Sequence, residues 1–153
     1  MTKPIQIVDY GLGNLASIVN MLRYLGYNSE IVSKPEEILS ANKLILPGVG
    51  SFDTAIKKII NQNLLEPLNE KANSSKVPIL GICLGMQLLL EKSDEGKKKG
   101  LGWIPGEVIS FKNHREKNIR IPHMGWNILN SMKQNKLLNN FDQFPQARFY
   151  FVH

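Results

Sequence analysis

Residues 77–91 read VPILGICLGMQLLLE and contain the only cysteine of the 153-residue chain. The apolar run before the cysteine predicts a strand, and Met86 to Glu91 predicts a helix. Cys83 stands in the turn between them, flanked by Gly81 and Gly85, which lack a Cβ and allow a tight turn. A strand, a tight turn and a helix in this order are the thiol analogue of the hydrolase nucleophile elbow.

Two interpretations of Cys83 are open at this point. As a nucleophile, it would have its thiolate form favoured by the N–H groups that begin the next helix. As a structural residue, it would be buried and would behave as a small hydrophobic side chain. The glycines on both sides favour the nucleophile.

Composition predicts one globular domain spanning 1–153, since 42% of the residues are hydrophobic and 21% are charged. We see no secretion signal and no apolar stretch long enough to span a membrane, so we expect a cytoplasmic protein. A single cysteine excludes an internal disulfide and a zinc site built on several thiolates. We expect neither a metal nor a cofactor.

The net charge of +6 comes from lysines and arginines spread along the chain, and it is densest at Lys97–Lys99 and around His114–Lys117. A solvated face is the first explanation of both clusters, and an acidic protein partner is the second. Neither cluster is interleaved with aromatic residues as base stacking requires, so we expect no nucleic-acid binding.

The first half of the chain alternates short apolar runs with helical patterns, which predicts an α/β fold. This fold is an open, mostly parallel, flavodoxin-like sheet with helices on both faces. The predicted strands are Ile5–Asp9, Ser29–Val32, Lys43–Leu46 and Val77–Leu80. The second half is β-rich, and we expect it to extend the same sheet. Its predicted strands include Trp103–Phe111, Trp126–Leu129 and Arg148–Val152.

Ligands of open parallel sheets bind at the carboxyl ends of the strands, where three segments should meet: Tyr10–Asn14, Pro47–Gly50 and Cys83. Glycines in PGVG allow the backbone to turn its N–H groups outward, toward the oxyanion formed when a thiolate attacks a carbonyl. The N–H of Leu84 would be a second donor. PGVG alone is commonly an ordinary turn, and its pairing with the Cys83 turn favours the oxyanion hole.

Two further patterns assign no function. GLGNLA, residues 11–16, fits a loose dinucleotide-binding fingerprint. The second strand, however, ends without the acidic residue that holds a ribose. A nucleophilic cysteine also needs a base, and none of His114, His123 and His153 has a carboxylate at a suggestive spacing.

Six segments together resemble one family, the glutaminase subunits of imidazole glycerol phosphate synthase, which are class I (triad-type) glutamine amidotransferases of histidine biosynthesis. The resemblance covers essentially the whole chain. The segments are DYGLGN, LILPGVGSFD, GICLGMQLL, SDEGKKKGLGW, IPHMGWN and FYFVH.

The resemblance implies the chemistry of the site. Cys83 would attack the carboxamide of glutamine, giving a glutamyl thioester and ammonia. Backbone N–H groups of the Val49–Gly50 segment and of Leu84 would form the oxyanion hole, the Val49 N–H after the PGVG peptide turns over. Gln87 and Glu95 would hold the substrate, with Glu95 pairing with its α-ammonium group.

The resemblance also implies a partner, a (β/α)₈-barrel cyclase that receives ammonia through a channel. Asn14, Trp126 and Tyr150 fall in segments that would face it, although Trp126 could also be a core residue. The family's catalytic histidine and glutamate lie beyond the FYFVH segment, so we expect a chain that is truncated at its C-terminus.

Two other functions stay open: a non-catalytic module that docks on the barrel, and an amidotransferase subunit that feeds amidation of a surface sugar.

Overall fold

The computed structural model describes residues 3–75, 77–113, 120–129 and 147–152. The chain divides into two compact units, Met1–Ser110 and Phe111–His153. The expectation of one domain stays a prediction. None of the helices in the described ranges is long and apolar enough to cross a membrane.

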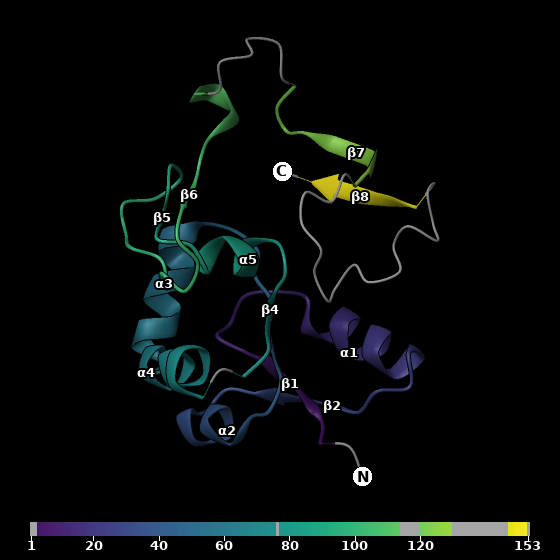
Figure 1. The fold of residues 1–153 in the computed structure, drawn as a ribbon, viewed down its shortest axis with the longest axis vertical. Helices are drawn as coiled ribbons and strands as arrows, with labels where there is room; N and C mark the ends of the chain where they lie inside the picture. Colours follow the sequence, from purple (N-terminus) through teal and green to yellow (C-terminus); the bar gives the residue numbers. More distant parts are fainter. Residues whose placement is uncertain (1–2, 76, 114–119, 130–146, 153) are drawn as a thin grey trace. The chain divides into compact units, whose positions relative to one another are not determined.

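The first unit alternates strands and helices as expected (Figure 1). In chain order its elements are β1 (Ile5–Val8), α1 (Leu15–Tyr24), β2 (Ser29–Val32), α2 (Pro35–Ser40), β3 (Leu44–Leu46), α3 (Phe52–Asn61), α4 (Leu65–Asn69), the π-helix Glu70–Ser74, β4 (Ile79–Gly81), α5 (Leu84–Leu88), β5 (Lys92–Ser93) and β6 (Glu107–Val108).

The main sheet has the strand order β2-β1-β3-β4, and all of its pairings are parallel. The order reverses direction between β1 and β3, so the loops that follow these two strands begin side by side. The predicted open parallel sheet is confirmed.

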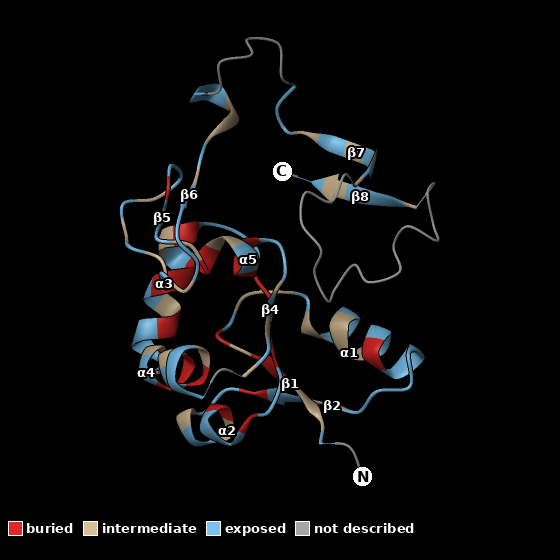
Figure 2. Ribbon diagram, viewed as in Figure 1, coloured by how far each residue is buried: buried red, intermediate tan, exposed pale blue. Residues whose placement is uncertain are grey.

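Helices cover both faces of this sheet, because alternate residues of each strand point to opposite sides. Ile7 and Ile45 pack against α1 with Leu22. Val8 and Leu46 belong to a larger core on the other face. That core takes buried residues from α2, α3, α4 and α5, and the ribbon of these helices is red at their buried positions in Figure 2.

In the part of the second half that the structure describes, no strand extends the main sheet, so that prediction is wrong for these residues. β5 and β6 pair only with each other, in a two-stranded parallel ladder. The run Trp103–Phe111, predicted as one strand, forms only β6, because Pro105 cannot donate a ladder hydrogen bond and Gly106 has a φ of +128°.

The second unit contains the short 3₁₀-helix Phe111–Asn113 and the strands β7 (Met124–Ile128) and β8 (Arg148–Val152). β7 and β8 form an antiparallel pair in which Trp126 lies opposite Tyr150. This pairing is also separate from the main sheet.

Candidate active site

Cys83 stands at the turn between β4 and α5. Its backbone has φ +55° and ψ −119°, a conformation that L-residues avoid and that costs roughly 1–3 kcal/mol. The residue is exposed, which excludes the interpretation as a buried structural cysteine. A strained, exposed thiol between a parallel strand and a helix has the geometry of a nucleophile elbow.

Glycine at position 85 lets the start of α5 lie against the end of β3. A Cβ on Gly85 would overlap the carbonyl oxygen of Leu46 and would lie 3.0 Å from the carbonyl carbon of Pro47. The helix start is also tied to the turn, since the N–H groups of Met86 and Gln87 donate to the Cys83 carbonyl at 3.0 and 3.2 Å. Cys83 is therefore held close to the loop after β3.

That loop, Pro47–Gly50, contacts both the Cys83 turn and the loop after β1. A Cβ on Gly48 would lie 2.8 Å from the Gly85 nitrogen and 2.5 Å from the Tyr10 hydroxyl oxygen. A Cβ on Gly13 would lie 3.2 Å from the Pro47 Cβ. The predicted meeting of three loops at the carboxyl ends of β1, β3 and β4 is confirmed.

Tyr10 holds the first residue of this loop. Its side chain is fully buried, and its hydroxyl donates to the Pro47 carbonyl at 2.6 Å. Burial raises the pKa of the Tyr10 hydroxyl, and the negative charge of a Cys83 thiolate raises it further. The hydroxyl therefore stays protonated and keeps donating while Cys83 is ionised. The sequence alone does not identify Tyr10 as a supporting residue. It shows only that a polar aromatic residue directly follows the predicted strand Ile5–Asp9.

The backbone donors predicted for the oxyanion hole are unengaged. Leu84 opens α5, where the first N–H groups have no acceptor inside the helix. Within the described ranges, neither the Leu84 N–H nor the Val49 N–H donates a hydrogen bond. Val49 is half exposed, and Gly50 has a φ of +92°, which glycine adopts without strain. Both peptide groups remain available to a developing oxyanion.

The two predicted substrate-binding side chains come from the same unit as Cys83. Gln87 lies in α5, one turn after Cys83, and is partly buried. Glu95 is exposed in the loop after β5, where its N–H donates to the Ser93 Oγ at 3.2 Å.

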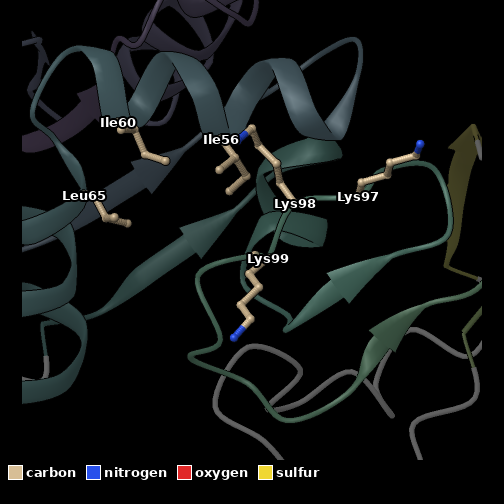
Figure 3. A pocket seen from close by; sticks show the side chains of 7 residues that line it. Ile56, Ile60, Leu65, Lys97, Lys98 and Lys99 are labelled. Carbon is tan, nitrogen blue, oxygen red and sulfur yellow. The ribbon is translucent and has the colours of Figure 1, made fainter.

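The same loop continues into Lys97–Lys99, which borders a pocket of about 370 Å³ beside α3. Ile56, Ile60 and Leu65 form its apolar side. Figure 3 shows the Lys98 side chain running alongside Ile56 toward α3, whereas Lys97 and Lys99 extend away from it in different directions. The three ammonium groups do not converge on one point.

Asn14, predicted to face the partner, has a local role. Its side-chain oxygen accepts the Ser17 N–H at 3.2 Å and so caps the N-terminus of α1. The residue is exposed, which leaves it accessible for the predicted contact as well.

In the second unit, Trp126 and Tyr150 form a cross-strand aromatic pair. Their ring centroids lie 5.5 Å apart in an edge-to-face arrangement. Trp126 is 64% exposed and Tyr150 is 53% exposed, which favours a surface role for Trp126 over a place in the core. Met124 and Ile128 point to the same side of β7 as Trp126 and are exposed too. The strand pair therefore presents an apolar face.

The described residues assign no base to Cys83. His123 lies in the second unit, where its Nε2 is 3.5 Å from the Asn127 Nδ2 and its ring packs edge-on against Phe111. His114 and His153 lie outside the described residues. Nowhere in the described ranges do three or more His, Cys, Asp or Glu side chains gather as metal ligands would.

Comparison with known proteins identifies the family. Residues 6–151 match the model of the class-I glutamine amidotransferases. The HisH subunit of imidazole glycerol phosphate synthase from Leptospira borgpetersenii is 45% identical over 150 residues, which are 97% of this chain and 72% of that subunit. The second HisH subunit of Methanococcus maripaludis is 47% identical over 149 residues, with the same two coverages.

A solved structure described as a glutamine amidotransferase supports the fold. It superposes with a TM-score of 0.66 at 18% sequence identity and covers 82% of this chain and 63% of its own. The chain therefore belongs to the class-I glutamine amidotransferases and, within them, to the HisH subunits of imidazole glycerol phosphate synthase.

Proposed function

We propose that this chain is the glutaminase subunit of imidazole glycerol phosphate synthase and hydrolyses glutamine to glutamate and ammonia for histidine biosynthesis. Membership of the HisH subunits supports this function. The single observation that carries the mechanism is the strained, exposed Cys83 at the turn between β4 and α5.

Cys83 supplies covalent catalysis. Its sulfur attacks the carboxamide carbon of glutamine, and the electron pair of the carbonyl moves onto oxygen. When the carbonyl re-forms, the C–N bond breaks, and the proton given up by the thiol leaves with the amine as ammonia. Water then attacks the thioester and breaks the S–C bond, which releases glutamate and restores the thiol.

Backbone donors stabilise the charge that develops on oxygen. The unengaged N–H groups of Leu84 and Val49 come from the two loops that meet at Gly48 and Gly85. A donor aimed at a developing oxyanion is worth about 3 kcal/mol of barrier in other hydrolases. Tyr10 supports one of these loops by holding the Pro47 carbonyl.

Substrate recognition falls to two side chains. The Glu95 carboxylate pairs with the α-ammonium group of glutamine, since hydrogen bonds between two ionised groups are stronger than those between neutral groups. Gln87, partly buried one helical turn beyond the nucleophile, offers both a donor and an acceptor to the substrate.

The ammonia acceptor is a cyclase subunit, which we expect to be a (β/α)₈ barrel in the cytoplasm. The apolar face of β7 and β8 supports docking, because exposed contiguous apolar surface marks interaction sites. Trp126 and Tyr150 are the interface residues that we expect on this face, and Asn14 is the one that we expect in the first unit.

Ammonia release from glutamine tests the proposal. We expect a full-length form of the protein, together with its cyclase partner, to release ammonia, and Cys83→Ser to abolish this release without changing thermal stability. Glu66→Gln, which alters an exposed residue of α4, serves as the control. Undiminished release by Cys83→Ser would refute the mechanism. No release by the chain and its partner together would favour the non-catalytic docking module instead.

A further inference from the structure

Asp53 joins two segments that lie far apart in sequence. It stands in the first turn of α3, and its side-chain oxygens accept backbone N–H groups from the loop after β5. Oδ1 accepts from Lys97 and from Lys98, both at 2.9 Å, and Oδ2 accepts from Lys97 at 3.1 Å. Two consecutive peptide groups of this loop are thus bound to one carboxylate.

The approach of the loop to Asp53 requires glycine at position 96. A Cβ on Gly96 would overlap the Asp53 Oδ1 and would lie 3.2 Å from a ring carbon of Phe52. A larger residue would displace either the Asp53 carboxylate or the loop. The contact therefore depends on the residue that directly follows Glu95.

The segment around Glu95 is also closed on its other side. The side-chain hydroxyl and the carbonyl of the buried Ser93 accept the N–H groups of Glu95 and Gly96, at 3.2 and 3.1 Å. Further along, the Gly100 N–H donates to the Glu91 carbonyl at 2.7 Å. Hydrogen bonds to Ser93 therefore close the turn that carries Glu95, and the bond between Gly100 and Glu91 closes the wider loop around it.

Asp53 connects this backbone to the catalytic loops by a short path. Pro47–Gly50 leads into Ser51, whose side chain caps α3, and Asp53 follows in the same turn. Lys98 and Ile56 of α3 also line the same pocket (Figure 3), so the two segments border a common space. A displacement of the Lys97 and Lys98 backbone relative to α3, and so relative to Pro47–Gly50, would break the Asp53 hydrogen bonds.

We propose that Asp53 is a positioning residue for glutamine recognition, acting through Glu95: it fixes the Glu95 loop at a set place relative to Pro47–Gly50. This inference rests on the proposed function. A purely structural alternative is that Asp53 only stabilises the start of α3, where a carboxylate is favoured by the helix dipole.

Covalent labelling of Cys83 separates these possibilities without requiring turnover. The diazoketone analogue of glutamine carries the α-ammonium group that Glu95 would recognise, whereas iodoacetamide alkylates the same thiol without it. For Asp53→Ala in the full chain, we expect the analogue concentration that gives half-maximal labelling to rise about tenfold, since hydrogen bonds to a charged group are lost. The rate with iodoacetamide should stay within about twofold of wild type.

Two further variants sharpen the result. Asp53→Asn keeps an Oδ1 acceptor for the N–H groups of Lys97 and Lys98, so its half-maximal analogue concentration should lie close to that of wild type. It also replaces Asp53→Ala as the test variant if Asp53→Ala folds poorly. Glu66→Gln, which removes a first-turn carboxylate from α4 instead, should leave both labelling reactions unchanged.

A double-mutant cycle tests whether Asp53 acts through Glu95. In a Glu95→Ala background, adding Asp53→Ala should change the half-maximal concentration by less than about twofold. An unchanged value for Asp53→Ala alone, or a full tenfold effect that persists without Glu95, would overturn the inference. If wild type shows saturable labelling that glutamine blocks, either of these results leaves the proposed function standing. If wild type shows no such labelling, the proposed function and the inference about Asp53 are both refuted.

Discussion

The buried hydroxyl of Tyr10 donates a 2.6 Å hydrogen bond to the carbonyl of Pro47. It links the segment after β1 to the first residue of the Pro47–Gly50 loop, which we propose supplies a donor to the oxyanion and call the oxyanion loop. The bond holds the peptide group between Pro47 and Gly48. It does not hold the next peptide group, between Gly48 and Val49, whose N–H can still turn. The bond therefore supports the loop without using the Val49 N–H, which we propose as a donor to the oxyanion.

Tyr10→Phe should weaken both the fold and the reaction. Loss of the hydroxyl leaves the Pro47 carbonyl without its partner, which should lower the free energy of unfolding by about 1–3 kcal/mol. Ammonia release should fall as well, because the oxyanion loop loses its support. Urea unfolding and an ammonia assay measure the two effects. Tyr24→Phe, at a residue that is 86% exposed, is the control and should change neither stability nor ammonia release. If Tyr10→Phe equals wild type in stability and in ammonia release, the hydrogen bond is dispensable.

Gly85→Ala should be strongly destabilising. Its Cβ would overlap the Leu46 carbonyl oxygen, an atom of a central strand that cannot move aside. We expect a loss of about 3 kcal/mol in the free energy of unfolding. Gly102→Ala is the control: its φ is +66° and its added Cβ would meet no atom within 4 Å, so the expected cost is about 1 kcal/mol. Equal costs for the two variants would mean that α5 can shift away from β3.

Acid should release the Glu95 loop. The N–H groups of Lys98 and then Lys97 lower the pKa of Asp53 below its ordinary value of 3.8. A depressed folded-state pKa gives stability that is present above the unfolded value and is lost as pH falls through the folded value. The amide resonances of Lys97 and Lys98 should therefore shift below pH 3.8 in wild type.

Asp53→Asn should abolish this amide titration. A residual acid loss of stability should remain in that variant, because the Ser33 and Lys34 N–H groups lower the pKa of Glu37 in the same way. Amides that titrate identically in Asp53→Asn would show that another carboxyl is responsible.

Trp126→Ala should weaken cyclase binding more than it weakens the fold. An interface aromatic of this kind costs about 2 kcal/mol or more on truncation, which is about thirtyfold in affinity. The fold should lose only the ring contact with Tyr150. Calorimetric titration with the cyclase and a thermal melt measure both quantities. Tyr27→Ala, at an exposed aromatic of the first unit, is the control. Unchanged affinity together with a large loss of thermal stability would remove Trp126 from the interface.

The sequence was sufficient to predict the main sheet and the meeting of its loops. Alternating strands and helices predict a parallel sheet, and the loops that follow its strands then share one edge. The strand order β2-β1-β3-β4 was not predicted, because alternation does not specify which strands are neighbours. The turn at Cys83 was predictable because two glycines flank a single cysteine between apolar segments.

Other parts depended on contacts that the sequence does not reveal. Tyr10 meets Pro47 across 37 positions, and Asp53 meets Lys97 across 44. The helix α2 was overlooked although Pro35, Glu36 and Glu37 are typical of a helix start. The short apolar runs of the second half correctly indicated strands, but they did not specify which strands pair with each other.

The glutamyl thioester on Cys83 is the species that tests the mechanism most directly. The full chain and its cyclase partner would be mixed with glutamine, quenched in acid during turnover, digested and analysed by mass spectrometry. We predict a glutamyl adduct on the peptide that contains Cys83, absent from the sample without glutamine. Steady ammonia release with no adduct on that peptide would contradict covalent catalysis by Cys83.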